Sequence, residues 1–314
     1  MIFFIKNVLN SPSAMIAMTG FTKSEFDFLL PDFEKAEDEY AKKTNIDKKR
    51  KRAPGGGRKP NLRTATERLF FILFYFKTYP LQQVAAVLFG MSLGQTNEWI
   101  HRLSEVLKMA LGKGAYLPER NPAASEAALE KCPGLSFVID GTERRIQRPK
   151  EPEKQKKYYS GKKKGHTVKN NIIADAAAKK VICLSDTYEG KKHDKKIADE
   201  ENPTFPKGSN IFKDTAFQGY EPENTNCYQP SKKPRGKQMP LEDRLFNKMI
   251  SGVRIIAEHV LSGVKRLHIV KDVFRNTKEG FSDLVMEIAC AMHNLRVSCR
   301  IPKCSKKSPE PVWH

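Results

Sequence analysis

The spacing of the apolar residues changes near residue 133, and this change limits the folds that the chain can adopt. Before it, apolar residues recur every three or four positions, as on one face of a helix. After it come short runs rich in β-branched residues, which are typical of strands and lie at residues 135–139, 166–173, 180–185 and 209–212. A helical region followed by strands and then helices predicts an α/β (α+β) architecture rather than a barrel.

The N-terminal part of the chain is predicted to be a helical lead-in followed by a basic arm. Thr22 and Glu25 have the spacing of a capping box, which starts a helix with an apolar face. Pro31 is expected to keep this helix short, because proline lacks an amide hydrogen and clashes with the preceding turn. Residues 42–63 then carry ten basic residues against one acid. Such a segment indicates either an arm that contacts a DNA backbone or a solvated linker.

A helix-turn-helix is predicted next. Capping boxes at residues 64–67 and 92–95 open two helices, and a shorter helix between them ends at Gly90. The predicted internal face consists of Val84, Ala85, Leu88, Trp99, Leu103 and Val106. The residues of the last helix that are predicted to be exposed and to contact phosphates or base edges are Gln95, Thr96, Asn97 and Arg102. A helical hairpin without a role in DNA binding is the alternative.

Two of the strand-like runs lead directly into acidic residues. Asp140 follows the run at 135–139, and Asp214 follows the run at 209–212. A strand that ends in a carboxylate is a rigid way to place a metal ligand. Either aspartate taken alone is explained as well by a turn.

A long helix is predicted over residues 241–263, and it carries a third acidic candidate. Arg254, Glu258 and Lys265 are spaced by four and seven positions, which places them on one side of this helix. Glu258 is therefore able to face the two aspartates. A surface ion pair between Arg254 and Glu258 is the alternative.

The charge of the chain favours a polyanionic partner. Lys and Arg number 56 against 36 Asp and Glu, which gives a formal net charge of +20. Each phosphate that a basic residue neutralises releases condensed counterions, so this surplus favours nucleic acid. A ribosome-associated protein or a merely basic soluble protein is the alternative.

The densest basic stretch of the second half lies at residues 144–169. It contains eleven basic residues against two acids, and Tyr158 and Tyr159 lie among them. A hairpin with this composition, with Lys162, Lys163 and Lys164 at its turn, suits the tracking of a DNA backbone and the stacking of a base. A solvated surface loop is the alternative.

Five motifs occur in a fixed order along the chain. They are VIDGT at 138–142, YSGKKKGH at 159–166, HD at 193–194, DTAFQG at 214–219, and Arg-x3-Glu-x6-Lys at 254–265. With these motifs, roughly residues 60–298 resemble the DDE transposases of the insertion sequence 5 superfamily, which are related to Harbinger-type elements. The sequence departs from that pattern at Ser251, where the family usually has Tyr, and at Ala216, where Gly is common.

The resemblance implies a ribonuclease-H-like catalytic domain. Carried over by motif, Asp140, Asp214 and Glu258 are the catalytic residues and the ligands of two Mg²⁺ ions, for which Mn²⁺ can substitute. Carboxylates brought this close repel one another unless cations neutralise them, and a metal pair suits in-line phosphoryl transfer. Arg254 and Lys265 are then expected to bind DNA phosphates. Asp194 is a rival for the second position and is otherwise expected to cap the next helix.

The implied activity is that of a DNA transposase. Such an enzyme binds the terminal inverted repeats of its element, cleaves the DNA ends and joins the 3′ hydroxyls to target DNA. The implied partners are double-stranded DNA, at the element ends and the target site, and further copies of the chain, in a homodimer or higher oligomer. We expect a cytoplasmic, nucleoid-associated bacterial protein without a membrane span. The alternative, favoured by Ser251, is an inactive transposase-derived protein that binds DNA sequence-specifically.

Together these patterns divide the chain into five predicted segments. In order, they are a helical lead-in with a basic arm (1–57), a helix-turn-helix DNA-binding domain (58–112), a linker (113–133), a ribonuclease-H-like catalytic domain (134–300) and a basic C-terminal tail (301–314).

Overall fold

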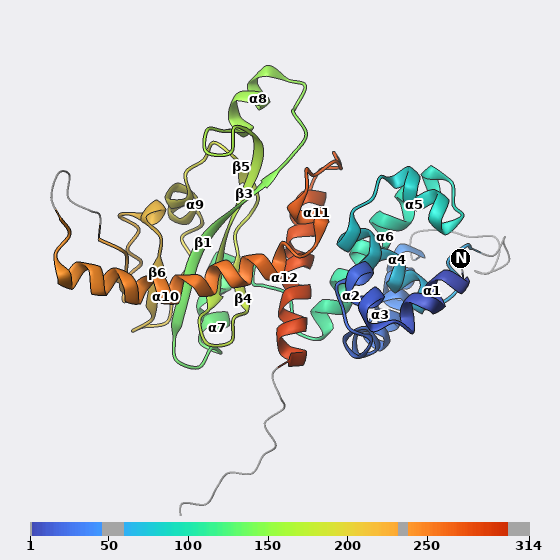
Figure 1. Cartoon of the computed structure of the whole chain (residues 1–314), viewed down its shortest axis with the longest axis horizontal. Helices are drawn as coiled ribbons and strands as arrows, with labels where there is room; N and C mark the ends of the chain where they lie inside the picture. The colour runs from blue at the N-terminus through green and yellow to red at the C-terminus, as the bar shows by residue number, and fades with distance from the viewer. Residues whose placement is uncertain (1, 46–59, 232–237, 301–314) are drawn as a thin grey trace, which may run out of the picture.

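The computed structural model describes residues 2–45, 60–231 and 238–300, and its first part is entirely helical (Figure 1). The helices of this part are α1 (Ile2–Leu9), α2 (Pro12–Thr19), α3 (Lys23–Asn45), α4 (Ala65–Thr78), α5 (Gln82–Phe89) and α6 (Leu93–Lys113). One apolar core joins them and continues into the last helix of the chain, so the helical part is packed onto the rest.

The helix α3 is longer than the sequence predicts. The capping box at its start is confirmed, because the Thr22 N–H donates to Glu25 Oε2 (2.8 Å) and the Glu25 N–H to Thr22 Oγ1 (3.2 Å). Pro31 does not end the helix, which continues to Asn45. The buried rings of Phe26 and Phe33 on both sides of the proline hold the helix against its neighbours, and this packing outweighs the lost hydrogen bond. Residues 42–45 of the predicted basic arm belong to α3, and its residues 46–59 lie outside the described residues.

The predicted helix-turn-helix is confirmed in α4, α5 and α6, and both of its capping boxes form. Part of its predicted internal face is wrong: Val84 and Leu88 are 46% and 44% exposed. The helix α5 buries Phe89 instead, whose ring packs edge-on against Phe71 at a centroid distance of 4.9 Å. Packing against the aromatic side chains of α4 thus determines which face of α5 is buried.

The second part of the chain is built on a mixed sheet. Its strands are β1 (Ser136–Arg145), β2 (Tyr159–Ser160), β3 (Gly165–Asp175), β4 (Val181–Leu184), β5 (Tyr188–Glu189), β6 (Asn210–Lys213) and β7 (Asn226–Tyr228). They are ordered β2-β3-β1-β6-β7, and β4 and β5 also pair with β3. The pairs of β3 with β1 and with β4 are antiparallel, whereas β1, β6 and β7 run parallel. The predicted fold class, a helix-turn-helix region followed by an α/β catalytic domain, is confirmed.

Helices cover both faces of this sheet. Along β3, Ile173 belongs to the apolar cluster that includes α9 (Asp194–Glu201), whereas its neighbour Ile172 belongs to the core of the opposite face. That opposite face carries α10 (Leu241–Val264), α11 (His268–Lys271) and α12 (Phe281–Arg300), and Figure 1 shows α10 running across the sheet toward the other two. Shorter elements are η1 (Pro122–Ala124), α7 (Ser125–Leu129), α8 (Pro152–Tyr158) and η2 (Thr215–Phe217).

No helix in the described ranges is both long and apolar enough to cross a bilayer. The predicted segment boundaries stay predictions.

Candidate active site

Asp140 and Asp214 come together because β1 and β6 are parallel neighbours. In the register of this pair Ile139 lies opposite Lys213, so the next residue of each strand is one of the two aspartates. Asp214 follows the end of β6, as predicted, and its Oδ1 accepts from the Thr215 N–H (2.6 Å). Asp140 does not end its strand, because β1 continues to Arg145. The prediction of a strand end was wrong for Asp140, since the polar residues that follow it pair with β3.

The environment of Asp140 disfavours its negative charge. Burial, together with the charges of Asp214 and Asp194, raises the pKa of Asp140 to about 6. The N–H of Gly141, which donates to Asp140 Oδ1 (2.8 Å), and the guanidinium of Arg254 oppose this shift. A bound cation would relieve the unfavourable burial of the Asp140 charge beside other carboxylates.

Asp194 lies beside this pair but does not cap a helix. His193 is the N-cap of α9, without a side-chain bond to the helix, and Asp194 is the first helical residue, so the predicted cap is wrong. Asp194 Oδ1 instead lies 3.1 Å from Lys169 Nζ. Its carboxylate also abuts Gly141, where an added Cβ would stand 2.8 Å from Asp194 Cγ. Gly141 therefore allows α9 to approach the strand that carries Asp140.

The cations of α10 lie near the aspartates. Arg254 Nη2 is 3.2 Å from Asp214 Oδ2, so Arg254 pairs with the aspartate rather than with Glu258. Lys265 follows the end of α10, and burial, aided by the charge of Lys163, lowers its pKa. The charge of Asp140 acts on Lys265 in the opposite direction. Both predicted phosphate-binding cations of α10 thus interact with the aspartates.

Glu258 shares a groove with Asp140. The side chain of Glu258 is exposed, and both residues line an open groove of about 830 Å³ between α10 and α12. In the described part of the chain, no three His, Cys, Asp or Glu side chains lie close enough together to hold a metal ion. The structure therefore brings Asp140 and Asp214 together. That Glu258 binds a metal ion together with them stays a prediction.

The chemistry of these residues fits a hard divalent cation. Carboxylate oxygens are the ligands that Mg²⁺ prefers, and a cation at Asp140 and Asp214 would remove the repulsion that raises the Asp140 pKa. The identity of the metal stays a prediction.

The predicted DNA-contacting residues of α6 differ in their accessibility. Gln95 and Asn97 are exposed. Thr96 is fully buried and its hydroxyl donates to the Ser92 carbonyl (2.9 Å), so the prediction that it is exposed is wrong. Arg102 is half-buried, because its guanidinium lies over the ring of Trp99, 5.1 Å from the centroid.

The predicted basic hairpin is mostly exposed. Lys162 and Lys163 are exposed, and so is Lys164, which precedes β3 in the left-handed region (φ 47°). Arg144 differs from the rest of the basic stretch: it is 2% exposed and donates to the Ser282 carbonyl (2.9 Å) and to Asn170 Oδ1 (2.8 Å). Arg144 is therefore not available to DNA, because its position on β1 points it under α12.

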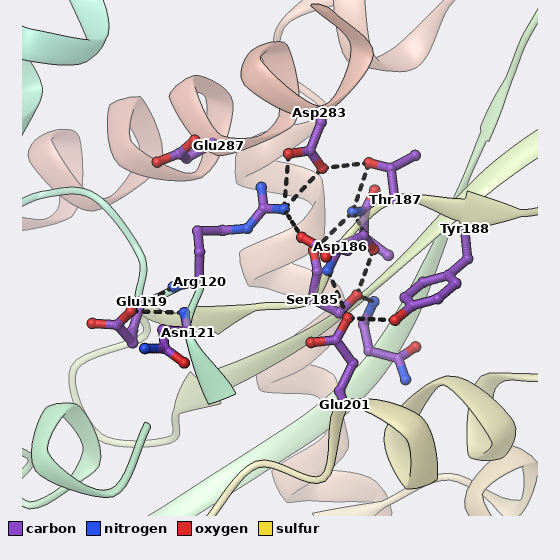
Figure 2. Close-up of polar contacts among 12 residues, drawn as sticks. Glu119, Arg120, Asn121, Ser185, Asp186, Thr187, Tyr188, Glu201, Asp283 and Glu287 are labelled. Atoms are coloured by element: carbon purple, nitrogen blue, oxygen red, sulfur yellow. Dashed lines mark hydrogen bonds and ion pairs between the residues drawn. The ribbon is translucent and has the colours of Figure 1, made fainter. Parts of the chain in front are cut away.

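Sequence reasoning did not predict the polar network that holds the start of α12 (Figure 2). Arg120 Nη2 donates to Asp186 (2.6 Å) and to Asp283 at the start of α12 (2.9 Å), and Thr187 Oγ1 donates to Asp283 (2.7 Å). These residues are far apart in the chain and no spacing rule links them.

Comparisons with known proteins agree with this geometry. The family model described as "DDE superfamily endonuclease" matches residues 139–294, and the one described as "Helix-turn-helix of DDE superfamily endonuclease" matches residues 60–113. The "Probable transposase for insertion sequence element IS702" of Microchaete diplosiphon is 25% identical over 264 residues, which are 84% of this chain and 87% of that protein. No solved structure matches significantly. Membership in the insertion sequence 5 superfamily is consistent with these matches and stays a prediction. The chain belongs to the DDE superfamily of transposon endonucleases and carries the superfamily's helix-turn-helix ahead of its catalytic region.

Proposed function

We propose that the protein is a DNA transposase that binds the terminal inverted repeats of its element, cleaves the DNA ends and joins the 3′ hydroxyls to target DNA. The observation that carries this proposal is the pairing of β1 with β6, which sets Asp140 beside Asp214 in a chain that matches an endonuclease family. The relative with a transposase name matches this chain over both the helix-turn-helix and the catalytic region, which supports the same activity.

Asp140, Asp214 and Glu258 are the residues proposed to hold the metal ions. Two Mg²⁺ ions, or Mn²⁺ in their place, would supply activation of the attacking hydroxyl and stabilisation of the leaving oxygen. Arg254 lies beside Asp214 and Lys265 interacts with Asp140, which supports the proposal that both bind the phosphates next to the scissile bond. The Arg254 guanidinium offers a planar fork, whereas the half-buried Lys265 ammonium acts as a point charge.

The helix-turn-helix is proposed to read the element ends. Gln95 and Asn97 are exposed near the start of α6, where side chains of a recognition helix reach base edges, and Arg102 follows about two turns later. The exposed lysines at 162–164 are proposed to follow the DNA backbone. The active form is proposed to be a homodimer or higher oligomer that acts in the bacterial cytoplasm, at the nucleoid.

Strand nicking by purified protein tests the proposal. We expect Asp140→Asn, Asp214→Asn and Glu258→Gln to lower Mg²⁺-dependent nicking of element-end DNA by roughly a thousandfold, since several kcal/mol of transition-state stabilisation would be lost. DNA affinity without metal should persist in all three variants. Asp199→Asn is the matched control, because Asp199 is an exposed acid on α9 that pairs with Lys195.

Two outcomes would change the assignment. Nicking that survives in all three variants would remove the proposed triad. A loss of nicking in Asp194→Asn together with normal activity in Asp214→Asn would move the second position to Asp194. An inactive derivative is not favoured by the comparisons, and the unusual Ser251 is an exposed residue of α10.

A further inference from the structure

Five basic residues from different elements gather beside the active-site groove. Lys77 lies in α4, Lys271 ends α11, and Arg296 and Arg300 lie in α12, while Arg266 precedes α11. Lys77 Nζ donates to the Arg266 carbonyl (2.9 Å), which ties α4 to this region. We call these five residues the cationic cluster.

The members of the cationic cluster repel one another. Burial lowers the pKa of Lys77, and the charges of Arg266, Arg296 and Lys271 lower it further. Burial, together with the charges of Arg266 and Arg300, lowers the pKa of Arg296 to about 10. The lowered pKa values of Lys77 and Arg296 indicate that positive charge outweighs negative charge around these two residues.

Few acids balance the cationic cluster within the protein. In residues 2–45, 60–231 and 238–300, no carboxylate lies within ion-pair distance of Lys77, Arg266, Lys271 or Arg296. Arg300 has a distant partner, since its Nε lies 3.7 Å from Glu25 Oε1. The charge of an external anion would therefore lower the free energy of this region.

Arg296 is the most deeply placed member. It is 4% exposed, and its Nη2 donates to the Gly263 carbonyl (3.1 Å) near the end of α10. Its Nε is buried without a hydrogen-bond partner in the structure. A buried guanidinium N–H without a partner is costly, so an additional acceptor is expected there.

The cationic cluster and the acidic residues share one groove. Arg266, Lys271, Arg296 and Arg300 line the same open groove of about 830 Å³ as Asp140 and Glu258. A ligand that extends from the cluster along this groove therefore reaches the proposed catalytic carboxylates. Such a ligand must offer several negative charges spread over its length.

We propose that the cationic cluster binds the phosphodiester backbone of double-stranded DNA where it enters the active-site groove. This phosphate site is separate from the helix-turn-helix and from Arg254 and Lys265. The inference rests on the proposed function in taking DNA as the substrate, but it concerns residues outside the proposed triad. A row of phosphates matches cations drawn from several elements, with forks from the arginines and point charges from the lysines.

The salt dependence of DNA binding tests this proposal. The double variant Lys271→Gln, Arg300→Gln changes two exposed side chains, so its fold should persist. With a duplex of about 30 base pairs and EDTA present, its slope of log affinity against log salt should be less steep by roughly 1.8, at about 0.9 per lost phosphate contact. Affinity near 0.1 M salt should fall roughly tenfold to a hundredfold.

The matched control also removes two positive charges, but from residues outside the cationic cluster. Lys131→Gln, Lys207→Gln also changes two exposed lysines, and it should leave the slope within roughly 0.3 of the unmodified protein. Equal slopes for the two double variants would overturn the proposal, as would a loss confined to a duplex RNA of the same length. Because EDTA excludes catalysis, the phosphate site can be supported while the nuclease proposal fails, or the reverse.

A charge-preserving variant separates contact from folding. Arg266→Lys should keep the salt slope, because one cation replaces another, while Arg266→Gln should make it less steep by roughly 0.9. A similar slope in these two variants would mean that Arg266 contributes no phosphate contact.

Discussion

Asp140 and Arg144 lie four residues apart on β1 and face the same side of the sheet, yet their charges have opposite surroundings. Arg144 is buried under α12, and its guanidinium donates to the Ser282 carbonyl and to Asn170. Asp140 faces an open groove, and burial together with the charges of Asp214 and Asp194 raises its pKa to about 6.

The two surroundings indicate different roles for two positions on one strand. A buried charge with protein partners on several sides joins elements of the fold, as Arg144 joins β1 to α12. A carboxylate kept among other carboxylates lowers stability, and such an arrangement is expected where a bound cation compensates. The half of β1 near Asp140 thus serves the proposed chemistry, and the half near Arg144 serves the packing of α12.

Exchanging Arg144 for an apolar residue should have the largest effect on stability. Arg144→Met leaves the Ser282 carbonyl and Asn170 Oδ1 buried without their donor, which costs about 2–4 kcal/mol in free energy of unfolding. Urea denaturation measures this loss. Asp140→Asn is the control on the same strand: without metal at about pH 7 it should raise the free energy of unfolding, because the folded pKa of Asp140 lies above its ordinary value. Loss of stability in Asp140→Asn and none in Arg144→Met would reverse the two roles.

The sequence predicts those features that depend on neighbouring residues. The capping boxes form because a hydroxyl and a Glu or Gln side chain are three residues apart, and Asp214 follows its strand as expected. The buried face of α5 is not predictable in this way, because this short helix carries apolar residues on several faces. Packing against the rings of α4 determines that Phe89 is buried. Thr96 is polar but satisfies its hydroxyl within its own helix, so polarity alone did not reveal its burial.

The groove is harder to predict than the aspartate pair. Asp140 and Asp214 are joined by one strand pairing, which short apolar runs already suggest. The cationic cluster needs α4, α11 and α12 to assemble, and nothing in the spacing of Lys77 and Arg296 links them. The burial of Arg144 is also not predictable from the sequence. This residue lies in a basic stretch that is expected to be exposed, but the register of β1 with β3 buries it.

A buried histidine beside the groove gives a smaller, pH-dependent effect. Burial, together with the charges of Arg296 and Arg300, lowers the pKa of His293 to about 4. The folded state therefore keeps His293 neutral, while the unfolded chain takes up a proton near its ordinary pKa. The stability from this residue is present above about pH 6.5 and is lost as the pH falls toward about 4, by up to about 3 kcal/mol.

Urea titrations across this pH range test the prediction. The difference in free energy of unfolding between the protein and His293→Gln should shrink as the pH falls, because glutamine has no proton to gain. The His293 Nε2–H donates to the Lys179 carbonyl (2.9 Å), and the glutamine amide can keep that bond. A difference in free energy of unfolding that stays constant with pH would mean that His293 is solvated in the folded state, whereas Arg144 is buried.

The smallest predicted change in stability concerns the contact between α10 and α12. Alanine substitutions at two glycines of α10, Gly263 and Gly252, test this contact. At Gly263 an added Cβ would overlap the His293 ring, whereas at Gly252 no atom lies within 4 Å of the added Cβ. Gly252→Ala should stabilise the protein by up to about 1 kcal/mol through helix propensity. Gly263→Ala should lose about 1–2 kcal/mol, because the ring must move and packed cores resist added volume.

These two variants also test whether DNA binding in the groove depends on the contact between α10 and α12. The Gly263 carbonyl accepts from Arg296, so pushing α10 away from α12 displaces the deepest member of the cationic cluster. DNA affinity without metal should therefore fall in Gly263→Ala and remain unchanged in Gly252→Ala. Equal affinity in both, despite the stability difference, would mean that the helices can separate without altering the phosphate site, and the groove would then depend on the exposed cations Lys271 and Arg300 alone.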